Sequence, residues 1–148
     1  GTLAFKGDIA QSPRDPVYAS LFVEALAGVL RVWLHDGTNS VRIDSTADFL
    51  NTRALADEMV LITLTWNSVL KDFVLYANGV VVPYTVGVGA GLTTLALLGT
   101  INPMAGHKLR LAKSFDTPLV PFTLYRITFL PLTMSQGDVD AYYSEVAE

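Results

Sequence analysis

Four residues with oxygen-bearing side chains lie close together in the sequence: Asp36, Asn39, Asp44 and Asp48. A calcium ion takes roughly six to eight oxygen ligands, so these four residues could supply part of a coordination shell. Asp36 and Asn39 also frame the sequence Asp36-Gly37-Thr38-Asn39. Asp and Asn side chains often bond to the backbone of their own turn. We favour the turn interpretation, in which no cofactor is required, and keep Ca²⁺ as the alternative.

Two tryptophans and a histidine are further candidates for contacting a ligand. Trp33 alternates with apolar residues and shares its side of the chain with Arg31 and His35. We therefore expect Trp33 to be the more exposed tryptophan. Trp66 ends an apolar run and is more typical of a core position. The predicted ligand-contacting residues are Trp33, His35, Asp36, Asn39 and Trp66.

The residue pattern argues against the common enzymatic sites. The chain has no cysteine, which excludes thiolate zinc sites and cysteine nucleophiles. Hydrolysis of a glycosidic bond needs two carboxyl groups roughly 5 to 9.5 Å apart. The four glutamates do not form a paired motif on one predicted strand. Asp138 and Asp140 fall in a predicted helix, where acids favour the N-terminus. We predict that the domain is not an enzyme.

The composition describes one charge-poor globular domain. The chain has 148 residues, with 10 Lys+Arg, 14 Asp+Glu and a formal net charge of −4. Charged residues make up 16% of the chain, below the roughly 25% of ordinary soluble domains. The acidic balance and the lack of a basic cluster predict no binding to nucleic acid. Because the sequence opens Gly1-Thr2-Leu3, we expect residues 1–148 to be one domain of a longer protein.

Residues 73–106 carry no charge, a length that could span a bilayer. Prolines, asparagines and glycines interrupt this stretch, so strands joined by Gly-rich turns explain it better than a spanning helix. We therefore predict no membrane insertion.

Alternating apolar residues predict several antiparallel strands. Val29 to Ile43 contains two such runs around the Asp36 turn, which indicates a hairpin. A second hairpin is predicted where Asn78-Gly79 separates two apolar runs, since both residues of that turn tolerate positive φ. Further strands are predicted at Met59–Trp66, Leu95–Leu98, Lys108–Leu111 and Phe122–Leu130.

Two segments have a helical pattern. Ser135-Gln136-Gly137-Asp138 is close to a capping box, which predicts a short helix from about Gln136. Residues 16–27 carry an apolar stripe at helical spacing, but Gly28 and the alternation after it favour a strand, a turn and a strand. We prefer the second interpretation and keep the helix as the alternative.

The middle and the end of the chain resemble a known family. Leu61–Trp66 followed by Phe73–Val82, with its Tyr-x-Asn-Gly core, is similar to the laminin-G-like or concanavalin A-like lectin/glucanase pattern. The opening Leu3–Gly7 and the tail Leu132–Tyr143 also fit, although the family's common Trp-His before the middle strand is absent. The resemblance implies an all-β fold: an antiparallel β-sandwich with jelly-roll connections and a short C-terminal helix.

The resemblance also implies a function. We expect a non-catalytic, extracellular or virion-surface domain that recognises a glycan or a host-surface receptor. A phage tail fibre or spike, or a bacterial surface protein, would carry it. Low charge and high apolar content indicate interfaces, so we also expect a homo-oligomer, with a trimer favoured. The alternative is a structural domain for oligomerisation or packing, and a glycoside hydrolase is the third possibility.

Overall fold

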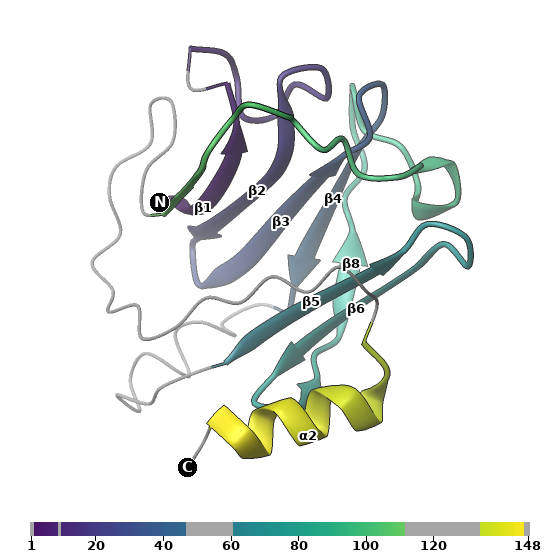
Figure 1. The fold of residues 1–148 in the computed structure, drawn as a ribbon. Helices are drawn as coiled ribbons and strands as arrows, with labels where there is room; N and C mark the ends of the chain where they lie inside the picture. The colour runs from purple at the N-terminus through teal and green to yellow at the C-terminus, as the bar shows by residue number, and fades with distance from the viewer. Residues whose placement is uncertain (1, 9, 47–60, 112–133, 147–148) are drawn as a thin grey trace.

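The computed structural model describes residues 2–8, 10–46, 61–111 and 134–146 (Figure 1). These residues form two antiparallel sheets and a C-terminal helix. The six-stranded sheet contains β1 (Thr2–Gly7), β2 (Ala19–Leu26), β3 (Val29–His35), β4 (Ser40–Ser45), β8 (Tyr84–Val86) and β9 (Leu109–Leu111). The three-stranded sheet contains β5 (Ile62–Asn67), β6 (Asp72–Ala77) and β7 (Val80–Val81). A short 3₁₀ helix, η1 (Leu95–Leu97), and the helix α2 (Gln136–Val146) complete the described elements.

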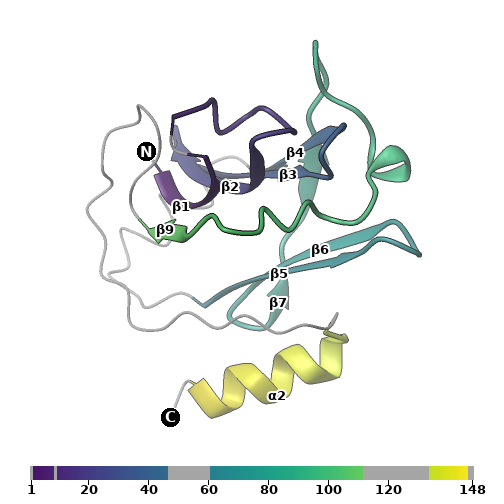
Figure 2. The same ribbon diagram turned by 45° about the horizontal axis from the view of Figure 1, so that its top comes forward.

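The sheets and the helix are stacked in layers. The strand order is β8-β4-β3-β2-β1-β9 in the larger sheet and β5-β6-β7 in the smaller one. Figure 2 shows the three-stranded sheet between the six-stranded sheet and α2. The predicted all-β architecture, two antiparallel sheets with a short C-terminal helix, is therefore confirmed at this level, and the jelly-roll connection stays a prediction.

The hairpin predictions are confirmed, because turn residues stand where the backbone needs them. Asn78 and Gly79 have φ values of 50° and 78°, as a two-residue turn between β6 and β7 requires. Ala27 and Gly28 have φ values of 50° and 80° and join β2 to β3 in the same way. The segment 16–27 thus contains a strand rather than a helix. Its apolar stripe is explained by β2 burying residues on both of its faces.

One predicted strand is wrong. Residues Leu95–Leu97 form η1, with the amides of Leu97 and Leu98 bonding back to Thr94 and Leu95. The run is apolar because Leu98 is fully buried against the core, not because the run joins a sheet. The predicted strand Phe122–Leu130 and the start of the predicted strand at Met59 lie outside the described residues.

The main core lies between the two sheets. Val32, Val41 and Ile43 of the six-stranded sheet belong to one buried cluster with Phe73 and Leu75 of β6. A further tie crosses from β8 to β6, because the Tyr84 hydroxyl donates to the carbonyl oxygen of Phe73 at 2.8 Å. The face of the six-stranded sheet that packs here is called the inner face below, and the opposite face the outer face.

The capping box predicted for α2 is confirmed. The Asp138 carboxylate accepts hydrogen bonds from the amide and the hydroxyl of Ser135, at 2.8 and 2.7 Å. The Asp138 amide donates back to the Ser135 hydroxyl oxygen at 3.3 Å. These bonds from Ser135 to the charged form hold the pKa of Asp138 below its ordinary value. Gln136 then ties the helix to the sheet by donating to the carbonyl oxygen of Gly79 at 2.9 Å.

Two glycine-to-alanine substitutions should have opposite effects on stability. Gly79 has a φ of 78°, so Gly79→Ala should lower the free energy of unfolding by about 1 kcal/mol. Gly137 lies in α2 with ordinary helical space around it, so Gly137→Ala should raise it by up to about 1 kcal/mol. Urea unfolding of both variants checks the pair. Equal effects of the two substitutions would contradict the assigned turn conformation.

Candidate functional site

Charged and aromatic side chains gather on the outer face of the six-stranded sheet. The register places Trp33 between Phe22 of β2 and Arg42 of β4. The next row across the same strands is Glu24, Arg31 and Asp44. Since side chains alternate along a strand, both rows face away from the core between the sheets.

Trp33 lies at the centre of this face, but it is covered. Only 8% of its surface is exposed, and its indole N–H donates to Glu24 Oε1 at 3.2 Å. The guanidinium carbons of Arg14 and Arg42 lie 5.4 and 5.9 Å from the centre of its ring. The expectation of an exposed Trp33 is therefore wrong. Alternation in the sequence assigned it to the outer face, but did not reveal that Arg14, from the loop after β1, lies over it.

Ion pairs link the second row to this tryptophan. Asp44 accepts from the Nε atoms of Arg31 and Arg42, at 2.6 and 3.1 Å, one on each carboxylate oxygen. Glu24 lies 3.5 Å from Arg14 Nη2 and 3.9 Å from Arg31 Nη1. Three guanidinium groups thus share two carboxylates. The arginine–tryptophan cluster, as named here, consists of Arg14, Glu24, Arg31, Trp33, Arg42 and Asp44.

Sequence reasoning missed most of this cluster. Arg31 and Trp33 were placed on one side of a predicted strand, and Arg42 and Asp44 alternate in the same way on the next strand. That shared alternation was the available signal for β3 and β4. The sequence could not assign Arg14 to the cluster, because Arg14 lies in a loop and has no alternating pattern that gives its face.

His35 holds the loop after β1 against the outer face. Its Nε2 is 3.1 Å from the carbonyl oxygen of Pro13, and its Nδ1 is 2.9 Å from the Ser40 hydroxyl. Because a carbonyl only accepts, Nε2 carries the proton and Nδ1 accepts from Ser40. His35 is fully buried, which lowers its pKa to about 4 although the Pro13 bond and the nearby Asp15 and Asp36 charges oppose the shift.

Asp36 and Asn39 form the turn between β3 and β4. The Asp36 carboxylate accepts from the amides of Thr38 and Asn39 at 2.9 and 2.6 Å, and from the Asn39 side chain at 3.0 Å. It also accepts from the amide of Gly99 at 2.8 Å. Burial alone would raise the pKa of Asp36, but these bonds from Asn39, Gly99 and Thr38 outweigh it and lower the pKa to about 2. The predicted turn at Asp36 and Asn39 is confirmed.

The candidate calcium ligands do not fit a metal shell in the described ranges. The carboxylates of Asp36 and Asp44 accept bonds from N–H groups on both of their oxygens. Asp48 lies outside the described residues. Among the residues that the structure describes, no group of three or more His, Cys, Asp or Glu side chains could hold a metal ion.

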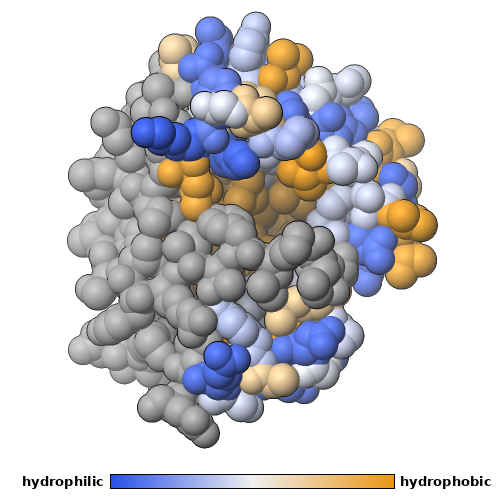
Figure 3. All heavy atoms as spheres, in the orientation of Figure 1, coloured by the Kyte–Doolittle hydropathy of each residue, from blue (hydrophilic) through white to orange (hydrophobic). Residues whose placement is uncertain are grey.

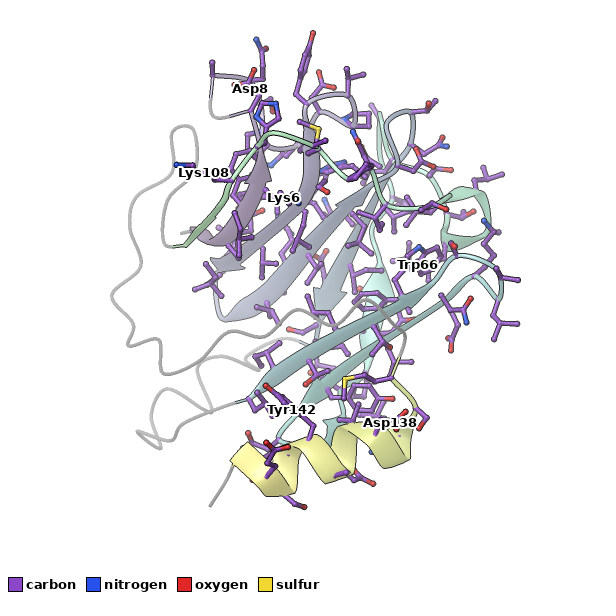
Figure 4. All side chains as sticks on the ribbon, in the orientation of Figure 1. Lys6, Asp8, Trp66, Lys108, Asp138 and Tyr142 are labelled. Carbon is purple, nitrogen blue, oxygen red and sulfur yellow. The ribbon has the colours of Figure 1, made fainter. Side chains whose placement is uncertain are left out.

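Trp66 belongs to a contact between the two sheets. Its indole N–H donates to the carbonyl oxygen of Gly99 at 3.2 Å, while the Gly99 amide donates to Asp36. Figure 4 shows Trp66 at the end of β5, toward this segment. The predicted residues therefore separate into two groups: Trp33 and His35 face outward under the loop after β1, whereas Asp36, Asn39 and Trp66 surround segment 97–99.

Comparison with known proteins found no matching family model, no matching curated protein and no matching solved structure. In the described part of the chain, no helix has the length and apolar character needed to cross a lipid bilayer.

Stability should depend on pH through His35. Its pKa is about 4 in the folded protein and near its ordinary value of 6.5 in the unfolded chain. The unfolded state therefore binds the proton first as the pH falls. The free energy of unfolding should decrease by about 3 kcal/mol between pH 6.5 and pH 4 and gain nothing more above pH 7.

Urea unfolding from pH 7.5 to 4.5 tests this dependence. His35→Gln should flatten the curve in that window, and His107→Gln serves as the control because it removes the other histidine. A curve that keeps its slope in His35→Gln would show that another group titrates there.

Proposed function

We propose that this domain is a non-catalytic recognition module that binds a carbohydrate on a cell surface or receptor. It would serve in an extracellular or virion-surface protein, such as a phage tail fibre or spike or a bacterial surface protein. The observation that carries the proposal is the arginine–tryptophan cluster. Sugar hydroxyl groups both donate and accept, and this cluster presents guanidinium donors beside the partly exposed Asp44 carboxylate on one face of a β-sandwich.

The exposure of the cluster supports contact with a ligand. The Arg14 side chain is 50% exposed, and those of Arg31, Arg42 and Asp44 are each partly exposed. Glu24 and Trp33 are buried beneath them. The guanidinium groups of Arg14 and Arg42 thus pack on the buried ring of Trp33. This packing limits the side-chain entropy that they lose when a ligand binds.

The contacts of the carboxylates favour binding over glycoside hydrolysis. Glycoside hydrolysis uses two carboxyl groups that act directly on the substrate. In the described ranges, Asp44 is held by two guanidinium groups and Glu24 by a guanidinium and an indole N–H. Both carboxylates are thus engaged by donors of the chain itself.

A second candidate function, assembly, is favoured by an exposed apolar tip. Val69 and Leu70 lie in the turn between β5 and β6 and are 85% and 73% exposed, and Leu97 of η1 is 65% exposed. Lys71 joins the two segments by donating to the carbonyl oxygen of Leu98 at 2.6 Å. Figure 3 shows hydrophobic residues at the right edge, where the tip lies. Clustered exposed apolar side chains often mark interfaces.

Binding to a glycan array tests the recognition proposal. The wild-type protein should bind one defined class of glycans on the array. Arg14→Ala should weaken that binding by about tenfold, the effect of losing one charge-assisted hydrogen bond. Arg14 is half exposed in a loop, so its loss should leave the fold intact. Lys6→Ala, which removes a cation from β1, is the matched control (Figure 4). Wild type that retains no glycan would overturn the proposal.

Sedimentation tests the assembly candidate. If the tip is an interface, wild type should sediment as an oligomer, with a trimer expected. Replacing Val69 and Leu70 by serine should then give a monomer, because the apolar area no longer favours association. Val88→Ser is the control, since Val88 is equally exposed but lies in another loop. Wild type that remains monomeric at every concentration would contradict this candidate.

A further inference from the structure

Arg42 has hydrogen-bonding capacity that the described part of the chain does not use. Its Nε donates to Asp44 at 3.1 Å. No residue in the described ranges accepts a bond from its two terminal Nη groups. None of the buried side-chain nitrogens or oxygens in those ranges lacks a partner, so these Nη groups reach the surface. An arginine bound through Nε alone leaves its forked end open, and that end matches the two oxygens of a carboxylate.

Arg31 and Arg14 add positive charge near Arg42 and leave its two Nη groups open. Arg31 donates from Nε to Asp44, and its Nη1 lies 3.9 Å from Glu24, beyond hydrogen-bond distance. Arg14 reaches Glu24 only at 3.5 Å. The cluster has three guanidinium groups and two carboxylates, so it keeps one positive charge in a chain whose net charge is −4. A local positive excess attracts an anion.

Gly87 leaves room for the guanidinium of Arg42. A Cβ atom at Gly87 would be 2.5 Å from Arg42 Nε and 2.8 Å from its Cζ, closer than real Cβ contacts. The φ of Gly87 is not in the left-handed region, so the backbone itself would accept alanine. The glycine is required by the space that the guanidinium occupies. On its other sides, the guanidinium is bound by Asp44 and lies over Trp33.

We infer that the arginine–tryptophan cluster binds an acidic sugar, a hexuronic or sialic acid, through its carboxylate. The two Nη groups of Arg42 take the two carboxylate oxygens, and Arg14 adds a second cation across Trp33. This inference rests on the proposed carbohydrate-recognition function and names the class of ligand. Gly87 acts as a positioning residue because it leaves free the space that the Arg42 guanidinium occupies.

Matched pairs of ligands test the carboxylate requirement by titration calorimetry. Tri-galacturonic acid is compared with its methyl ester, and sialyllactose with lactose, so that each pair differs in the carboxylate. At least one acid should bind, and its neutral partner should bind about tenfold more weakly or not at all. Added NaCl should weaken the acid's binding, because the site is partly exposed.

Two variants then locate the site. Arg42→Gln should weaken the acid's binding by about tenfold, and Gly87→Ala should weaken it as well although it removes no charge. Lys6→Gln is the charge-matched control on the inner-face side, and Gly137→Ala is the matched glycine control in α2. Both controls should bind like wild type. Thermal unfolding of each variant shows whether the fold is kept.

The outcomes separate this inference from the proposed function. Equal binding of an acid and its neutral partner would overturn the carboxylate requirement while leaving carbohydrate recognition standing. Acid binding that survives in a folded Arg42→Gln would overturn the assigned site. Binding of lactose 3-sulfate without binding of either carboxylate would overturn the choice of anion. Wild type that binds no saccharide at all would overturn both proposals.

Discussion

The six-stranded sheet buries apolar side chains on both of its faces, and each face needs its own cover. The inner face packs on β6 through Val32, Ile43 and Leu75. The outer face holds a second buried cluster around Phe22 and Trp33, to which the described part of the three-stranded sheet adds nothing. Its cover comes from loops, which must bring side chains to the face and also satisfy their own backbone groups.

The loop after β1 meets that requirement through one imidazole. His35 is neutral and buried, and its proton binds the carbonyl oxygen of Pro13, which would otherwise lose its solvation as the loop folds over the sheet. The same contact places Arg14, the next residue, over Trp33. The position of a surface cation is thus a consequence of a buried hydrogen bond rather than of local propensity.

The sequence predicts local structure well where chemistry and conformation coincide. The turn at Asn78-Gly79 needs positive φ values that these two residues accept. The helix cap needs the bond between Ser135 and Asp138, and both residues belong to the segment itself. In both cases the local segment alone determines the structure. The strand prediction for Leu95–Leu98 was wrong because a run of apolar residues indicates burial but does not distinguish a strand from a buried connection. The prediction that Trp33 is exposed was wrong for a related reason. Alternation gives the face of the strand on which a residue lies, whereas the exposure of Trp33 depends on Arg14, which comes from another part of the sequence.

Segment 98–99 has a mechanical consequence. Three side chains hold its backbone: Asp36 from the turn between β3 and β4, and Trp66 and Lys71 from the β5–β6 hairpin. Sliding one sheet along the other would strain these bonds together instead of one after another. Bonds that are loaded together share the force, so this end of the sandwich resists sliding of one sheet along the other. The three bonds therefore keep the two layers in register at this end.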